Sequence, residues 1–337
     1  MADIAREAGI SRASVSYILN DAPLKRYMNK ETIRRVNETA ARLGYIANDA
    51  ARAVRTGKSR TLLFLTPKLR WESNINVVHG ASIQAFSSGY QLKYLPIDPL
   101  CTKAEEVAAH ARNRMSAGVI TLNLPLKFLE QLAPLLKEAE IPLLQVGDAF
   151  PNISDLSVQA DHASGARETV DHLVKLGHRQ IAAMFNSHLY SSTMLRRKGF
   201  EAALKSHGIK MPKSYFREGR FDPRRIAEET RHLLALNPRP TAIFCDTDPS
   251  ALAVLFALRK AGIRVPEDIS VTGFVNLPLC DFTDPPLTSV DLPAEALGEK
   301  AAQCLIEIAE GLRQTADTTP EFLPTRLVVR ESTGPVT

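Results

Sequence analysis

Apolar residues in the first 44 positions recur at the spacing of helices that bury one face. Gly9 interrupts the first of these runs. Ser11 opens the second, because its hydroxyl can accept a free backbone N–H at a helix start. Gly44 follows the third run, where helices commonly end. The pattern therefore predicts three short helices, over about residues 3–8, 12–20 and 30–43.

The pattern changes at Arg60. Thr61–Thr66 (TLLFLT) is a continuous apolar run, as expected for a strand that is covered on both faces. Similar short runs then alternate with amphipathic segments, and the alternation starts again near Ser157. This alternation is typical of parallel β-α-β units. We expect strands at 61–66, 92–96, 118–122, 143–146, 181–185, 241–245, 270–274 and 325–329, with helices between them.

These elements divide the chain into a helical head, a linker and two α/β lobes. The head is expected at 1–46 and the linker at 47–59. The N-terminal lobe is expected to combine 60–158 with 291–320, and the C-terminal lobe to combine 159–290 with 321–332. Parallel sheets bind ligands beyond the carboxyl ends of their strands. A ligand site is therefore predicted in the cleft between the lobes.

Charge is distributed unevenly along the 337 residues. The whole chain carries 42 Lys/Arg and 37 Asp/Glu, a formal net charge of +5. Residues 1–60 contain twelve of the basic residues and six of the acidic ones, so the excess positive charge lies in the head and linker. A local basic region suits a polyanion such as DNA. By itself, the composition also fits a solvated basic face.

Residues 3–20 (DIAREAGISRASVSYILN) have the form of a helix-turn-helix motif, with a tight turn at Gly9. The second helix would enter the major groove of double-stranded DNA. Arg12 can donate twice to guanine, and Ala13 offers a methyl to thymine. A plain three-helix bundle with capping serines is the alternative. The candidate DNA contacts of this helix are Ser11, Arg12, Ala13, Ser14, Ser16, Tyr17 and Asn20.

Several other classes of protein are not favoured. The chain has no G-x-G-x-x-G after a strand, no Walker lysine, no H-E-x-x-H and no G-x-S-x-G, so neither an enzyme nor a cofactor is expected. The four cysteines are scattered and show no metal-ligand spacing. No apolar run reaches the roughly 18 residues of a membrane span. The N-terminus has no apolar signal-peptide core, so we expect a cytoplasmic protein rather than a secreted solute-binding protein.

The head, the basic segment 44–59 (GYIANDAARAVRTGKS) and the two lobes together resemble the LacI/GalR family of repressors over essentially the whole chain. The resemblance implies a periplasmic-binding-protein-like core of two Rossmann-like, parallel-sheet subdomains. It also implies a homodimer that regulates transcription from a near-palindromic operator. A small-molecule effector in the cleft, a sugar or a sugar-derived acid or phosphate, would control DNA binding.

In that family the linker forms a helix on DNA and inserts an apolar side chain into the minor groove. The matching residue is Val54, where leucine is usual. Valine is shorter and a poorer helix former, so a weaker wedge is expected. Ala47 replaces a usual proline, and Tyr17 stands where arginine is common. The basic loop 24–30 suits either phosphate contacts or solvent.

The resemblance also implies effector contacts at the lobe edges. Arg196 begins an R-x-x-G-F segment, and its guanidinium would clamp effector oxygens by donating two hydrogen bonds. Phe221 matches an aromatic that packs on the ligand, and Asn123 matches a polar contact. Thr247 and Asp248 match a usual Asn-Asp pair, in which Asp248 is interpreted as the cap of the helix that follows.

Other positions of the cleft depart from the family. Val275, in the segment GFVN that ends at Asn276, replaces a polar residue that pairs with sugar hydroxyls. Gln145 stands where an acid is frequent, and Trp71, the only tryptophan, could stack on the ligand or pack on the loop beneath it. With fewer acids beside Arg196, charge alone favours an anionic or partly apolar effector over a neutral sugar.

Overall fold

The protein is described as a computed structural model that divides into two compact units, Met1–Arg60 and Thr61–Thr337. The described residues are 1–19, 28–44, 59–67, 69, 72–98, 101–154, 156–186, 191–315 and 320–336. The expectations for Asn20, Ala47, Val54 and Trp71 lie outside these residues and stay predictions.

The first unit contains the three predicted helices, α1 (Ala2–Ala8), α2 (Arg12–Leu19) and α3 (Lys30–Arg42). Gly9 ends α1 with a φ of 63°, in the left-handed region that glycine adopts without strain. The side chain of Asn29 accepts a hydrogen bond from the backbone of Glu31 and caps α3. The three helices share a small apolar core that contains Ile4, Ala8, Val15, Ile18, Val36 and Ala40.

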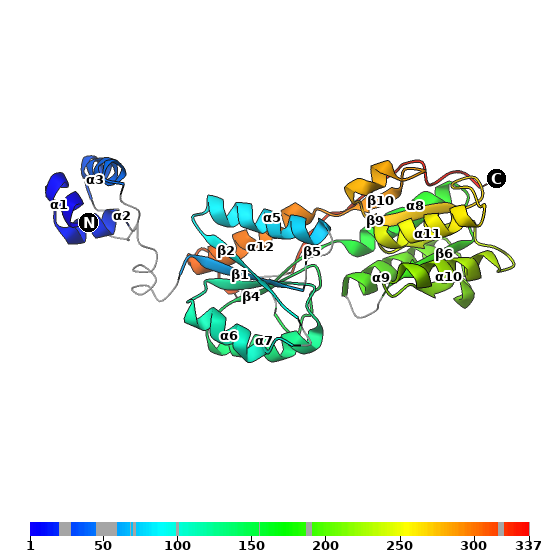
Figure 1. Cartoon of the computed structure of the whole chain (residues 1–337), viewed down its shortest axis with the longest axis horizontal. Coiled ribbons are helices and arrows are strands. Elements are labelled where there is room, and N and C mark those ends of the chain that lie inside the picture. Colours follow the sequence, from blue (N-terminus) through cyan, green and yellow to red (C-terminus); the bar gives the residue numbers. More distant parts are fainter. Residues whose placement is uncertain are drawn as a thin grey trace. The chain divides into compact units, whose positions relative to one another are not determined.

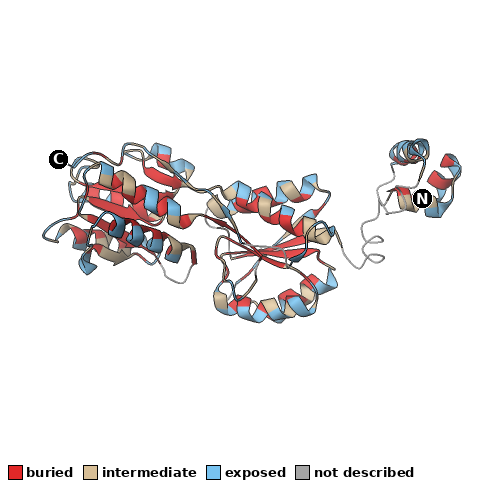
Figure 2. Ribbon diagram, turned by 180° about the vertical axis from the view of Figure 1, so that it is seen from behind, coloured by how far each residue is buried: buried red, intermediate tan, exposed pale blue. Residues whose placement is uncertain are grey.

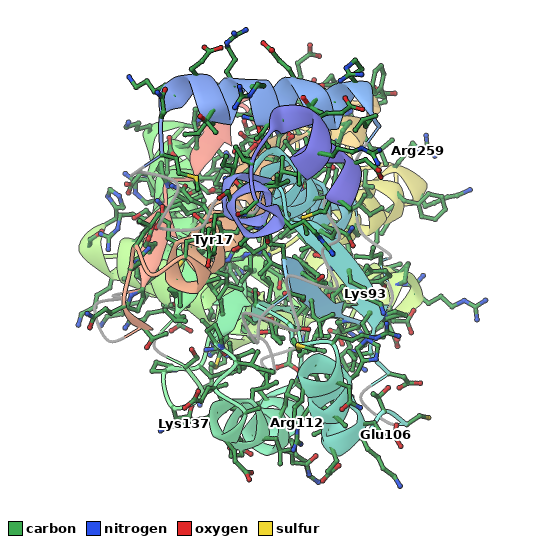
Figure 3. The ribbon with its side chains drawn as sticks, turned by 90° about the vertical axis from the view of Figure 1, so that its left-hand side faces the viewer. Tyr17, Lys93, Glu106, Arg112, Lys137 and Arg259 are labelled. Carbon is green, nitrogen blue, oxygen red and sulfur yellow. The ribbon has the colours of Figure 1, made fainter. Side chains whose placement is uncertain are left out.

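The second unit begins with a six-stranded sheet of order β11-β5-β4-β3-β1-β2, in which all pairs are parallel. Its strands are β1 (Thr61–Thr66), β2 (Gln91–Pro96), β3 (Gly118–Leu122), β4 (Leu143–Val146), β5 (Ser157–Ala160) and β11 (Glu321–Leu323). Helices α5 (Glu72–Ser87) and α12 (Ala294–Ala309) pack on one face, and α6 (Ala104–Asn113) and α7 (Leu126–Glu138) on the other (Figure 1). Charged side chains such as Glu106, Arg112 and Lys137 project outward from α6 and α7 (Figure 3).

A second six-stranded sheet has the order β12-β10-β9-β8-β6-β7, and only the β10–β12 pair is antiparallel. Helices α8 (His162–Lys175) and α9 (Ser191–Ser206) cover one face, and α10 (Pro223–Leu234) and α11 (Asp248–Lys260) the other. The strands are β6 (Ile181–Phe185), β7 (Phe216–Glu218), β8 (Ala242–Cys245), β9 (Ser270–Val275), β10 (Thr288–Asp291) and β12 (Arg326–Val328), joined in part by the 3-10 turns η2 (Lys213–Tyr215) and η3 (Pro278–Phe282).

Both sheets are buried between their helices, as the continuous apolar runs predict (Figure 2). The chain crosses between the sheets three times, after β5, after β10 and after β11. Strand β5 and strand β11 both belong to the first sheet, whereas the expected boundaries put residues 159–160 and 321–323 in the C-terminal lobe. Those boundaries are wrong by a few residues, because hydrogen bonding between distant strands, not local pattern, decides sheet membership.

Helices α5 and α12 approach each other closely at two glycines. A side chain at Gly80 would overlap the carbonyl group of Glu295, and one at Gly298 would overlap the carbonyl group of Val77. Both glycines are therefore needed for this contact, which joins an early helix to the returning C-terminal segment. Among the residues described, no helix is both long and apolar enough to cross a lipid bilayer.

Candidate functional site

Helix α2 offers one polar face of the head. The Ser11 hydroxyl accepts a hydrogen bond from the Ser14 backbone N–H at 3.0 Å, so the expected N-cap is present. The Ser11 and Ser14 hydroxyls also bond each other at 2.9 Å, which commits both to the helix start. Arg12 and Ala13 are exposed, and Tyr17 is half-buried on the same helix (Figure 3). The outward side chains of α2 are therefore accessible to a binding partner.

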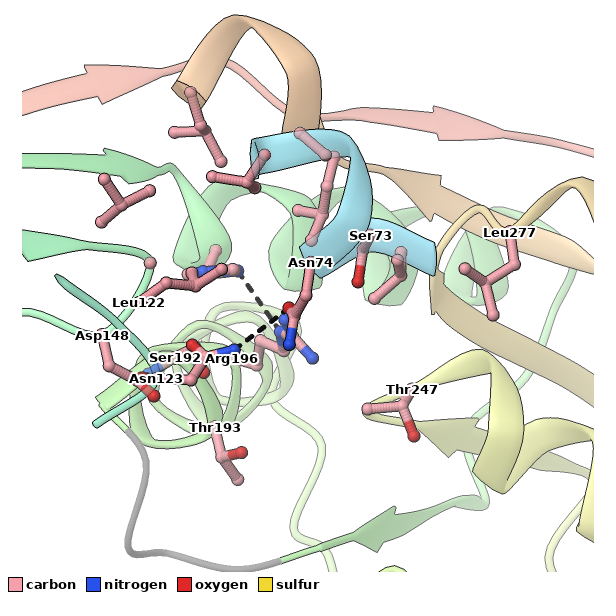
Figure 4. Close-up of a pocket in the computed structure, with 18 of the residues that line it drawn as sticks. Ser73, Asn74, Leu122, Asn123, Asp148, Ser192, Thr193, Arg196, Thr247 and Leu277 are labelled. Atoms are coloured by element: carbon pink, nitrogen blue, oxygen red, sulfur yellow. Dashed lines mark hydrogen bonds between the residues drawn. The ribbon is translucent and has the colours of Figure 1, made fainter. Parts of the chain in front are cut away.

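Within the second unit, a cavity of about 360 Å³ opens between the two sheets. Its walls come from the carboxyl ends of strands and the N-terminal ends of helices in both lobes, as expected for parallel sheets. Figure 4 shows Asn123, Asp148 and Ser192 close together on one side, with Thr247 and Leu277 on the other. The predicted residues that line the cavity are Asn123, Arg196, Phe221, Thr247 and Val275.

Arg196 lies on α9 with only 6% of its surface exposed. Its Nη1 donates to the backbone carbonyl of Asp246 at 2.5 Å, and its Nε donates to His162 Nδ1 at 3.3 Å. The guanidinium also lies over the Phe274 ring, with 4.3 Å to the ring centroid. Burial lowers the pKa of Arg196, while the nearby carboxylates of Asp246, Asp148 and Asp248 oppose that shift. The protein thus holds the guanidinium rigidly at the cavity wall.

Asp148, which the sequence prediction missed, faces the same cavity. Its Oδ1 accepts hydrogen bonds from the Ser191 hydroxyl at 3.0 Å and from the Ser192 backbone N–H at 2.7 Å. These contacts join the end of β4 in one lobe to the start of α9 in the other. Its Oδ2 is buried and has no protein partner among the described residues. Burial raises the pKa of Asp148, and the Ser192 and Ser191 hydrogen bonds oppose the shift.

Gln145, an expected effector contact, is not among the residues that line the cavity. It is fully buried within β4. Its amide donates to the carbonyl oxygens of Phe150 and Ser154, and its carbonyl accepts from the Phe150 backbone N–H. The side chain therefore closes the loop after the strand. An acid does line the cavity nearby, because Asp148 lies two residues beyond the end of β4.

The pair Thr247 and Asp248 also divides its roles differently from the prediction. Thr247 lines the cavity and is the N-cap of α11, accepting from the Ser250 backbone N–H. Asp248 does not line the cavity and is the first residue of the helix rather than its cap. Its carboxylate accepts from the Leu277 backbone N–H at 2.8 Å and from the Ser289 hydroxyl at 2.5 Å. Asp248 is therefore structural, as interpreted, but by holding a loop.

Asn276 likewise turns away from the cavity. Its amide donates to Asp291 Oδ1 at 3.0 Å, and its backbone N–H donates to the Ser289 hydroxyl. These hydrogen bonds hold a turn whose backbone is strained. Val275 and Asn276 in this turn have φ angles of 116° and 57°. Strain at a β-branched residue costs on the order of 1–3 kcal/mol and needs surrounding contacts to persist. The turn directs Val275 into the cavity wall, where it adds an apolar surface.

Two further wall residues have left-handed backbones. Asn123 has a φ of 54° and Phe221 a φ of 57°. The Asn123 amide donates to Asn74 Oδ1 at 3.1 Å, and the Phe221 backbone N–H donates to Asn186 Oδ1 at 2.8 Å. Local contacts thus hold both side chains at the cavity. Its other polar wall residues, absent from the prediction, are Ser73, Asn74, His162, Ser192 and Thr193.

The head and the cavity-bearing unit each match a known family of sequences. Residues 1–48 match the family described as bacterial regulatory proteins, lacI family. Residues 170–333 match the periplasmic binding protein-like domain. The chain belongs to the LacI family.

Relatives of this LacI-family protein match over nearly its full length. It is 27% identical to the HTH-type transcriptional repressor PurR of Photobacterium profundum, over 98% of this chain and 97% of that protein. It superposes on a Lac repressor dimer bound to operator and the anti-inducer ONPF with a TM-score of 0.78 and 26% identity, over 98% of both chains. A complex of the transcriptional regulator CelR with cellobiose gives a TM-score of 0.74 and 25% identity, again over 98% of both.

The electrostatics of this LacI-family cavity differ from the sequence prediction. That prediction rested on a shortage of acids beside Arg196, but Asp148, Asp246 and Asp248 all act on the guanidinium. Burial raises the pKa of Asp246 to about 6, while Arg196 and the Asn186 hydrogen bonds oppose the shift. The positive charge of Arg196 is therefore already compensated. The charge of the cavity therefore does not favour an anionic effector.

Proposed function

We propose that this LacI-family protein is a homodimeric, cytoplasmic repressor of transcription that binds a near-palindromic operator and has no catalytic activity. A small-molecule effector in the interlobe cavity would control that binding. The observation that carries the proposal is the cavity itself, where Arg196 and Asp148 present polar atoms from both lobes. The relative named as the repressor PurR supports the regulatory part.

The DNA-binding part rests on α2. Its exposed Arg12 and Ala13 lie at the N-terminal end of the helix, which reaches base edges when such a helix enters the major groove. Tyr17 follows on the same helix. A second copy of the head would read the second half of the operator, as a two-fold dimer requires. The other proposed DNA contacts are the minor-groove wedge at Val54 and the polar residues Ser11, Ser14, Ser16 and Asn20.

The effector part rests on the charge balance of the cavity. Because the carboxylates of Asp246, Asp148 and Asp248 act electrostatically on Arg196, a further anion would be repelled, whereas a neutral hydroxylated compound can donate to a carboxylate and accept from the guanidinium. CelR, named in complex with cellobiose, provides a precedent for a neutral sugar in this fold. An effector that contacts both lobes binds their closed arrangement more tightly than an open one, and that difference would couple the cavity to DNA binding.

The test begins with DNA. Full-length protein is used to select duplexes from a random library, and the selected sequence is measured against a scrambled duplex. We expect a near-palindrome whose affinity falls steeply with salt. The variant Arg12→Ala should lose selectivity, whereas Arg6→Ala, on the exposed face of α1 beside Asp3, is the matched control. A protein that selects no sequence would refute the proposal.

A further inference from the structure

His162 occupies an unusual place in the cavity wall. It is the first residue of α8, and only 3% of its surface is exposed. Its ring lies 5.9 Å from the Phe274 ring, centroid to centroid, and its Nδ1 accepts from Arg196 Nε at 3.3 Å. The imidazole and the guanidinium therefore form one unit that lies against Phe274 and faces the cavity.

The contact with Arg196 decides where the proton of the imidazole lies. A guanidinium only donates hydrogen bonds, so Nδ1 of His162 must be the unprotonated nitrogen. A neutral imidazole then carries its proton on Nε2. Burial, helped by the charge of Arg196, lowers the pKa of His162 well below its ordinary value, so the ring stays neutral. His162 is thus a permanent donor at Nε2 rather than a group that switches roles.

No hydrogen bond to Nε2 is present among the described residues, although the residue lines the cavity. The same wall contains the unpartnered Oδ2 of Asp148, a buried acceptor. Arg196 contacts His162 directly and acts electrostatically on Asp148. The polar end of the cavity therefore presents one unused donor and one unused acceptor. A buried polar atom without a partner is costly, so the Asp148 oxygen favours a ligand that donates to it, and His162 Nε2 has no acceptor among the described residues.

We propose that His162 is a specificity-determining residue of the effector site, whose Nε2–H donates a hydrogen bond to an oxygen of a neutral, hydroxylated effector. The proposal rests on the proposed function and adds a named contact to it. A hydroxyl group suits this end of the cavity because it can accept from His162 and donate to Asp148. A carboxylate could accept from His162 but could not donate to Asp148, and it would add negative charge beside three acids.

Two variants separate a binding role from a merely structural one. His162→Asn keeps an oxygen near the position of Nδ1, so Arg196 retains its partner, but the donor at Nε2 is lost. His162→Gln places an amide near the position of Nε2 and keeps a donor there. If His162 contacts the effector, the Asn variant loses about tenfold in effector affinity and the Gln variant is partly rescued. A role limited to holding Arg196 predicts the opposite order, which would overturn the proposal.

The probes are D-glucose, D-glucuronate and cellobiose, tested on the full-length protein by thermal shift and calorimetry. Glucose and glucuronate differ only at C6, so the pair isolates the effect of a negative charge. We expect a neutral probe to raise the wild-type Tm, to lose affinity in His162→Asn and to recover part of that affinity in His162→Gln. Stabilisation by glucuronate alone would contradict the proposal.

A measurement without any sugar tests the donor state directly. Imidazole ¹⁵N shifts of the full-length protein at pH 7, with the His162 signal assigned by its loss in His162→Gln, should show a neutral Nε2–H tautomer. A proton on Nδ1, or a protonated ring at that pH, would overturn the proposal. If no probe binds while the tautomer is as expected, the choice of effector class fails and the donor assignment stands.

Discussion

Replacing Arg196 with methionine should destabilise the core far more than the same change at its neighbour Arg197. Methionine fills much of the same volume but carries no charge and no donor. The change removes the hydrogen bonds to the Asp246 carbonyl and to His162 Nδ1 and the contact with the Phe274 ring. It also leaves the buried carboxylates without a nearby cation.

The magnitude follows from burial. Removing one partner of a buried ionic group costs about 3–5 kcal/mol, because the remaining charge stays desolvated and unpaired. Arg197 differs sharply, because 45% of its side chain is exposed and its carboxylate partner is Glu201, one helical turn away. Such an exposed pair contributes about 0.3–0.5 kcal/mol. Arg197→Met is therefore the matched control, one position along the same helix.

The assay is urea unfolding of the full-length protein, followed by circular dichroism through the transition of the core. We expect the Arg196→Met midpoint to fall well below that of wild type, and the Arg197→Met midpoint to stay close to it. The loss at Arg196 should also be smaller at pH 5 than at pH 8, because Asp246 and Asp148 can take up protons once the cation is gone. Equal midpoints for the two variants, or a loss that does not depend on pH, would refute the reasoning.

Three other predictions concern the head, the acids of the cavity and the helix contact. In a mobility-shift titration, Arg12→Ala should cost about 1–3 kcal/mol of discrimination at one operator position, as expected for a lost bidentate base contact; a uniform loss on every duplex would assign Arg12 to the phosphates instead. The pKa of Asp246 is raised to about 6 in the folded protein, so its contribution to folding stability is fully present below the unfolded-state pKa near 3.8 and is lost as pH rises through about 6. The urea midpoint of wild type should therefore fall over this pH range relative to that of Asp246→Asn, and a midpoint that does not fall would contradict the prediction. Gly298→Ala should lower the thermal midpoint, because the added methyl overpacks against the Val77 carbonyl at a cost of about 1–3 kcal/mol. An unchanged midpoint would show that α5 and α12 can move apart.

The head could be predicted from sequence because its information is local. Gly9, Ser11 and Asn29 each mark a helix end through contacts within a few residues. Eight of the twelve core strands among the described residues followed from short apolar runs for the same reason, whereas β5, β7, β10 and β11 were not predicted. Much of the cavity was also predictable, because side chains just beyond parallel strands or at helix starts meet at one edge of the sheet. Asn123 and Thr247 line the cavity because each follows the end of a parallel strand.

The tertiary structure decided which polar residues face the ligand and which face the protein. Gln145 and Asp148 are three positions apart, and only the loop that follows β4 shows that the first is bonded inward and the second lines the cavity. The charge around Arg196 also depends on Asp246 and Asp248, which reach it from another strand and helix.

Local sequence determined the helices, eight of the twelve strands among the described residues, and the edge of the sheets at which a ligand would bind. Only the tertiary structure determined that β5 and β11 join the first sheet, and that Arg196 holds His162 in one tautomer. The physical reason is the range of the interactions. Helix caps and apolar periodicity act within a few residues, whereas strand pairing and burial of charge depend on residues far apart in the chain.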